Sequence, residues 1–142
     1  MNDIQVLKVA LIILYDAENR VLLQHRTHDA ERLPDYWAFF GGEIEKWENT
    51  EEALRRETLE ELGYKLTAPE LIFEQNFRLS NAEGYMHVFV EEYLGDKSAI
   101  ELNEGQGMGW FDENELRELK IINHDREALR VIMDYIKNRD TK

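Results

Sequence analysis

A dense group of glutamates lies between residues 43 and 61. Eight of the chain's 30 acidic side chains fall in this segment, against three basic ones, so it carries a net charge of −5 (3 − 8) within a chain of −13. Crowded like charges destabilise a compact fold, so the cluster needs a physical reason. Carboxylate oxygens are the ligands that Mg²⁺ prefers, and a bound cation would offset the repulsion. The alternative interpretation is an acidic surface helix exposed to water.

Local signals place these glutamates on one helix. Asn49 has a typical N-cap side chain, and Glu52 three residues later completes a capping-box pattern. The helix is expected to run to Leu62, where Gly63 supplies a C-terminal stop.

A helical wheel gathers three acids on one face of this helix. At 100° per residue, Glu57, Glu60 and Glu61 fall at about 0°, −60° and +40°. A mainly apolar stripe at about 60° to 200° is expected to be buried, and it consists of Leu54, Thr58, Leu59 and Leu62. The acidic face therefore borders the buried face, as a metal platform requires.

Elsewhere, strand and helix patterns are mixed without regular alternation. This favours an α/β (α+β) fold with helices packed on a mixed β-sheet, in a single domain of residues 1–142. The strands near 66–79 and 85–94 should form an antiparallel pair joined through residues 81–84. The expected elements are strands at 4–15, 21–26, 66–79 and 85–94, and helices at 49–62, 112–119 and 125–137.

Composition and charge limit the class of partner. The chain has no cysteine, which excludes disulfides and thiolate sites and fits a reducing cytoplasm. A net charge of −13 repels nucleic acids and anionic membranes. The apolar N-terminal stretch is too short to span a bilayer, and its first charge is the acidic Asp3. We expect a small anionic substrate, bridged to the protein by cations.

The segment from Gly42 to Tyr64 resembles the signature of the Nudix hydrolase family. Thr58 departs from the usual aliphatic residue, and Trp47 stands where a glycine is common. A chance match to the signature in a chain of this composition has a probability on the order of one in 100,000. The resemblance implies a Nudix-like α/β/α sandwich. All seven fixed positions are filled, by Gly42, Glu48, Arg56, Glu57, Glu60, Glu61 and Gly63.

The resemblance also implies a site for Mg²⁺, with Mn²⁺ as a substitute. Glu57 and Glu61 would ligate the metal directly, and Glu60 would join through the metal or its waters. The carbonyl of Gly41 would be a further ligand. Mg²⁺ typically combines few protein carboxylates with the phosphates of a substrate.

Residues around these ligands are assigned roles by the same resemblance. Arg56 would orient a glutamate of the signature segment, Gly42 to Tyr64, which is called the Nudix box below. Glu48 would be its partner, unless Glu48 belongs to the metal shell instead. The loop containing Glu104 is similar to one that supplies an additional metal-binding glutamate in the 8-oxo-dGTP pyrophosphohydrolase branch. The general base that takes the proton of the attacking water is either Glu57 or Glu104, and the sequence does not choose between them.

Contacts to the rest of a substrate are less specific. Arg26 and Arg32 could bind phosphate, although lone arginines are more often surface charges. Trp37 and Phe39 could stack on a nucleobase, although aromatic side chains more often fill a core.

These features predict an Mg²⁺-dependent pyrophosphohydrolase that cleaves a nucleoside diphosphate linked to another moiety. A (d)NTP, cleaved to (d)NMP and pyrophosphate, is the first candidate, because the Glu104 loop resembles the triphosphate branch. Nucleotide sugars and ADP-ribose-type compounds are the alternative substrates. A non-catalytic nucleotide-binding regulatory module is the alternative of another class. Family members are often dimers, so a homodimer is a further expectation.

Overall fold

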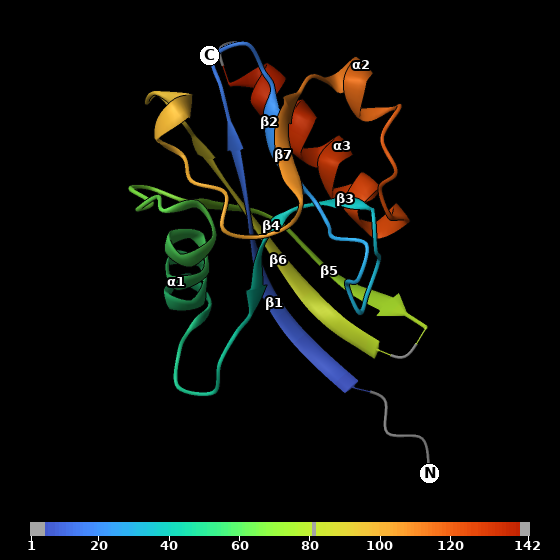
Figure 1. Cartoon of the computed structure of the whole chain (residues 1–142). Helices are drawn as coiled ribbons and strands as arrows, with labels where there is room; N and C mark the ends of the chain where they lie inside the picture. The colour runs from blue at the N-terminus through green and yellow to red at the C-terminus, as the bar shows by residue number, and fades with distance from the viewer. Residues whose placement is uncertain (1–4, 81, 140–142) are drawn as a thin grey trace.

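The computed structural model describes residues 5–80 and 82–139. Within these residues the strands form one seven-stranded sheet of order β3-β2-β1-β6-β5, with β4 paired to β1 and β7 paired to β2 (Figure 1). The β1–β6 pair is parallel and the others are antiparallel, so the predicted mixed sheet is confirmed. The strands are β1 (Gln5–Tyr15), β2 (Val21–His25), β3 (Trp37–Ala38), β4 (Phe40–Glu43), β5 (Glu70–Leu79), β6 (Ala82–Glu92) and β7 (Gly107–Phe111).

Helices cover both faces of this sheet. Helix α1 (Thr50–Leu62) packs against β1 and β4 on one face. On the other face α3 (Asn123–Asn138) packs against β5, beside the short α2 (Glu113–Leu116) (Figure 1). A 3-10 helix, η1 (Lys97–Ala99), follows β6. The predicted α/β/α sandwich is therefore observed. None of the helices in the described chain is long and apolar enough to cross a membrane.

Strand β1 divides the core into two clusters. Successive side chains of a strand point to opposite faces, so a continuously apolar strand is buried on both sides. Ile13 and Tyr15 join the cluster that contains the buried side chains of α3. Ala10, Ile12 and Leu14 join the cluster that contains those of α1. The central strand thus holds the two helices at fixed positions on either side of the sheet.

Helix α1 begins and ends where its local signals predict. The Asn49 side chain accepts a hydrogen bond from the Glu52 backbone N–H, and the Glu52 side chain accepts one from the Asn49 N–H, each at 2.8 Å. At the other end Gly63 adopts a left-handed conformation with φ of 62° and donates its N–H to the Leu59 carbonyl. These caps fix the length of the helix that carries the acidic residues.

The buried face of α1 differs from the predicted stripe. Leu59 is 51% exposed, so its assignment to the buried stripe is wrong. On the wheel used above, the buried arc runs from about −40° to about 140° rather than from 60° to 200°. The helix is rotated about its axis relative to the prediction, so that the acidic side turns toward the sheet and Glu61 itself is buried. The buried residues are Ala53, Leu54, Thr58, Glu61 and Leu62.

Other boundaries shift for identifiable reasons. Strand β5 starts at residue 70 rather than 66, because the backbone N–H groups of Thr67 and Ala68 bond to the buried Glu91 carboxylate instead of a strand. Strand β6 starts at residue 82, which shortens the expected turn; Asn81 in that turn lies outside the described residues, as does Ile4 of the first expected strand. Helix α2 ends at Leu116, three residues before the predicted end.

The N-cap of α1 gives a direct stability test. Replacing Asn49 by alanine removes the acceptor for the Glu52 N–H and should lower the free energy of unfolding by about 1 kcal/mol. Asn49→Ser keeps an acceptor and should stay within a few tenths of a kcal/mol of the wild type, roughly. Urea denaturation followed by circular dichroism measures both, and equal loss in the two variants would contradict a capping role.

Candidate active site

Arg56 connects three of the glutamates around α1. Its Nε and Nη2 atoms donate to the two carboxylate oxygens of Glu48, at 3.0 and 2.6 Å. Its Nη1 atom donates to Glu57 Oε1 at 2.9 Å and lies 3.4 Å from Glu60 Oε2. Nη2 also reaches the Glu43 carbonyl at the end of β4. The planar guanidinium therefore ties the helix to the loop before it and fixes one oxygen of Glu57.

Glu48 serves Arg56 in this arrangement. Both of its carboxylate oxygens bond to the guanidinium, and Oε1 also accepts the backbone N–H of Glu45 at 2.9 Å. The hydrogen bond from Arg56 lowers the pKa of Glu48 below its usual value. Of the two roles left open for Glu48, the geometry therefore favours the partner of Arg56 over the metal shell.

Glu61 is the buried carboxyl of the site. Its side chain lies beside that of Glu57, and its Oε1 accepts the backbone N–H of Gly41 at 2.7 Å. Only 7% of the residue is exposed. Burial, followed by the neighbouring negative charges of Glu57 and Glu104, raises the pKa of Glu61 to about 9, while the Gly41 N–H opposes this change. Two carboxyl groups held this close cannot both ionise comfortably without a cation.

The glycine pair of β4 makes room for these carboxyls. Gly41 has a φ of 128°, and a Cβ there would lie 2.2 Å from the Ala10 carbonyl oxygen. A Cβ on Gly42 would lie 2.8 Å from the Glu57 carboxyl carbon. Both contacts are shorter than atoms tolerate, so a larger residue at position 41 would press on the backbone of β1, and one at position 42 would displace the Glu57 carboxyl group.

The donor set fits a hard divalent cation. Glu57 and Glu61 offer carboxylate oxygens, and the neighbouring backbone of Gly41 belongs to the same cradle. Within residues 5–80 and 82–139, no group of three Asp, Glu, His or Cys side chains is close enough to enclose a metal ion. An ion held here would keep coordination positions for water or phosphate, as Mg²⁺ usually does.

Two further predicted ligands lie at the edge of this group. The Glu60 side chain is 59% exposed and points to Arg56, so its contribution through water stays a prediction. Glu104 acts electrostatically on Glu61. Its loop docks on the end of α1, where the Asn103 N–H bonds to the Glu61 carbonyl, and on β2, where the Gln106 N–H bonds to the His25 carbonyl. These long-range bonds bring Glu104 to the carboxyl pair.

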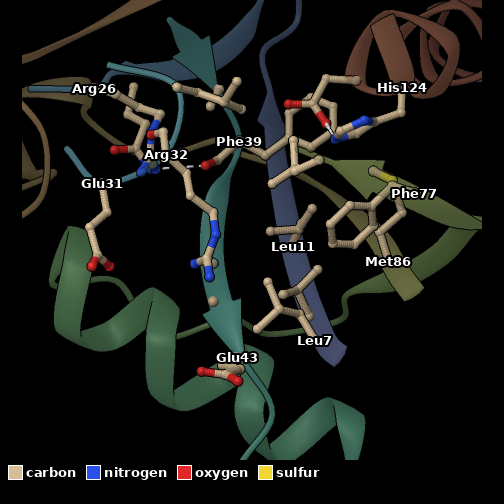
Figure 2. A pocket seen from close by; sticks show the side chains of 18 residues that line it. Leu7, Leu11, Arg26, Glu31, Arg32, Phe39, Glu43, Phe77, Met86 and His124 are labelled. Atoms are coloured by element: carbon tan, nitrogen blue, oxygen red, sulfur yellow. Dashed lines mark hydrogen bonds and ion pairs between the residues drawn. The ribbon is translucent and has the colours of Figure 1, made fainter. Parts of the chain in front are cut away.

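A cavity of about 460 Å³ begins beside the glycine pair. Gly41, Gly42 and Glu43 line one part of it, and Phe77 and His124 line another (Figure 2). Its walls come from β1, β4, β5, β6, the loop after β2 and the start of α3. The volume suits a small-molecule ligand that reaches from the carboxyl pair into an apolar pocket.

The predicted substrate contacts divide between the cavity and the core. Arg26, Arg32 and Phe39 line the cavity, and Figure 2 shows the Arg32 side chain extending toward Glu43. Trp37 is not among the lining residues; it stacks on the His25 ring at 4.5 Å and meets Phe111 edge-on. Trp37 therefore packs within the protein, and its predicted stacking on a nucleobase has no support in this geometry.

One lining residue has no counterpart in the sequence prediction. Asp125 lies in the first turn of α3, is 7% exposed and faces the cavity. A signal existed, because Asp125 precedes the buried Leu129 and Ile132 by four and seven residues and so shares their inward face. A charged residue at an inward position of an amphipathic helix is a candidate for function.

Comparison with known proteins agrees with this geometry. The family model of the NUDIX domain matches residues 6–132. The chain is 30% identical over 128 residues to the nucleoside triphosphatase NudI of Escherichia coli, covering 83% of this chain and 91% of that protein. It is also 30% identical over 103 residues to the NAD-capped RNA hydrolase NudC of Chromobacterium violaceum, covering 72% of this chain but only 37% of that protein.

Solved structures share the fold. The MutT protein from Methanosarcina mazei superposes with a TM-score of 0.80 at 17% identity, covering 98% of this chain and 100% of that one. Because the family model spans most of the chain and the box residues meet beside one cavity, the protein belongs to the Nudix hydrolase family.

Proposed function

We propose that this protein is an Mg²⁺-dependent pyrophosphohydrolase that cleaves a (d)NTP to a (d)NMP and pyrophosphate. The observation that carries the proposal is the pairing of Glu57 with the buried Glu61 beside the cavity. Such a pair favours a cation, and the phosphates of a nucleotide would complete its coordination. The long match to a protein named as a nucleoside triphosphatase supports a triphosphate over the alternative substrates.

The chain's own residues supply positioning and proton transfer. Arg56 holds one oxygen of Glu57, and the Gly41 N–H holds one oxygen of Glu61, so the other oxygens keep fixed positions. When bound, Mg²⁺ would lower the pKa of a coordinated water and neutralise charge on the phosphates. Phosphates next to Gly42 would lie within the reach of Arg32, which extends along the same side of the cavity (Figure 2).

Glu104 is the better candidate for the general base. One carboxylate oxygen of Glu57 already accepts a hydrogen bond from Arg56, and the other is assigned to the metal, which leaves neither for the attacking water. In the part of the chain described, the Glu104 side chain makes no hydrogen bond, yet it lies near enough to Glu61 to affect that group's pKa. A carboxylate in this position can accept a proton from water as the water attacks phosphorus.

Removing either paired carboxylate tests the metal site. Glu57→Gln or Glu61→Gln should lower kcat/KM for pyrophosphate release by roughly 100-fold or more, because an amide is a weak ligand for Mg²⁺. Neither change should lower the melting temperature of the metal-free protein, since each removes repulsion within the pair. Pyrophosphate and phosphate assays over a panel of (d)NTPs, nucleotide sugars and ADP-ribose measure activity and identify the substrate.

Glu51→Gln is the matched control for these variants. Glu51 lies on the exposed side of the same helix and pairs with Arg55, away from the carboxyl pair. It should keep wild-type activity. Full turnover in the Glu57 or Glu61 variants, or no hydrolysis of any compound in the panel by the wild type, would overturn the proposed function.

The role of Glu104 has its own test. If Glu104 is the general base, Glu104→Gln should lower kcat by about 100-fold or more while leaving the Mg²⁺ concentration for half-maximal activity nearly unchanged. Glu101→Gln, an exposed change in the same loop, should have no effect. A wild-type kcat in the Glu104 variant would transfer the role to Glu57, and a large shift in Mg²⁺ requirement would make Glu104 a ligand instead.

A further inference from the structure

Two loops from different parts of the chain meet beside the site. The 26–36 loop joins β2 to β3, and its Arg32 lines the cavity. The Glu104 loop, residues 100–106, joins η1 to β7 and carries the proposed general base. Contact with the substrate phosphates and proton transfer thus depend on two separate segments. Their relative position matters, because a misplacement of about 1 Å between reacting groups can cost about 100-fold in rate.

The side chain of Gln106 joins these two loops. Its Nε2 atom donates to the Arg26 carbonyl at 2.6 Å and to Asp35 Oδ1 at 2.9 Å, so both amide hydrogens are used. The Arg26 side chain in turn donates its Nε–H to the Arg32 carbonyl at 2.9 Å. Two hydrogen bonds, through Arg26, therefore connect Gln106 to the backbone of Arg32, whose side chain extends toward Glu43 in the cavity (Figure 2).

The backbone between Glu104 and Gln106 makes a tight turn. Gly105 has a φ of 83°, and a Cβ there would lie 2.7 Å from a backbone carbonyl oxygen of β2, so only glycine fits without strain. Glu104 acts electrostatically on Glu61, while Gln106, two residues on, reaches the 26–36 loop. The anchoring of Gln106 therefore limits where Glu104 can lie.

The 26–36 loop holds two residues in a costly backbone conformation. Leu33 and Asp35 have φ of 52° and 66°, a region that residues other than glycine seldom adopt. Such conformations persist where surrounding contacts hold them in place. Asp35 has one such contact from Gln106 to its carboxylate, and another at its carbonyl oxygen, which lies 3.1 Å from His25 Nε2. Loss of the Gln106 bond would let this loop relax.

We propose, building on the proposed function, that Gln106 is a positioning residue that fixes Arg32 and Glu104 relative to each other. With its bonds in place, a phosphate held near Arg32 presents its phosphorus to the water from which Glu104 takes a proton. Gln106 does not line the cavity, so it acts through these two residues. Its loss should lower kcat, whereas KM should change little, because each loop keeps its own contacts with the substrate.

An exchange of donor and acceptor tests this role. Gln106→Glu keeps the shape of the side chain but turns an oxygen toward the Asp35 carboxylate, and kcat should fall by about tenfold. Adding Asp35→Asn restores one bond with its direction reversed, so the double variant should return to within about threefold of the wild-type kcat. Asp35→Asn alone should change kcat by less than about twofold, because Gln106 can still donate to the amide oxygen. Steady-state kinetics over a range of (d)NTP concentrations gives kcat and KM separately.

Gln75→Glu is the matched control. Gln75 donates to Glu127 Oε2 at 2.8 Å on the exposed surface and does not line the cavity, so this variant loses the same kind of bond without touching the loops. It should keep the wild-type kcat. An equal loss of kcat in this control, a wild-type kcat in Gln106→Glu, or a double variant no faster than Gln106→Glu would refute the role of Gln106.

Amide hydrogen exchange separates this proposal from the proposed function. Gln106→Glu should speed exchange in residues 26–36 as well as in 100–106, and adding Asp35→Asn should slow it again in both. This measurement needs no turnover, so it decides whether Gln106 couples the loops even if the wild type hydrolyses no nucleotide and the proposed function fails. Faster exchange confined to residues 100–106 would show that Gln106 does not hold the 26–36 loop.

Discussion

The packing of two carboxyl groups against the glycine pair of β4 is the constraint on which the rest of the site depends. Removing charges from water costs several kcal/mol each, roughly, unless partners replace the lost hydration. Arg56 provides that partner for Glu57, and the Gly41 N–H provides part of it for Glu61. The remaining deficit appears as the raised pKa of Glu61, which a cation would remove. The absence of a side chain at Gly42 follows from the same constraint.

The sandwich supplies the rigidity that this arrangement needs. Strand β4 pairs with β1 over four residues, so the glycines of β4 are held against the strand whose side chains enter both core clusters. Helix α1 is pressed onto that strand by Leu54 and Leu62, which are fully buried. Because the acidic side of the helix is turned toward the sheet, the apolar contacts that hold the helix in place also bury Glu61. The same interface between helix and sheet therefore stabilises the helix and imposes the cost of burying the Glu61 carboxyl group.

Features governed by local chemistry were predictable from the sequence, and those governed by long-range contacts were not. The ends of α1 follow from Asn49, Glu52 and Gly63, which act within one helical turn. The exposure of Leu59 depends on how far the helix rolls on the sheet, and the packing of Trp37 depends on β2 and β7. The box spacing predicted Glu57 and Glu61 as a pair, but neither the Gly41 bond nor the docking of the Glu104 loop has a local signal.

Two buried acids, Glu61 behind Gly41 and Asp125 in the cavity wall, face the same cost of burial but differ in their neighbours. Burial is the largest cause of the raised pKa at both Glu61 and Asp125. Glu61 has other carboxyls beside it, so ionisation there calls for a cation that a phosphate ligand can share. Asp125 lies among apolar side chains such as Leu11, Phe77 and Met86, with Arg26 as the charge that opposes the rise of its pKa, so it can meet the cost by keeping its proton.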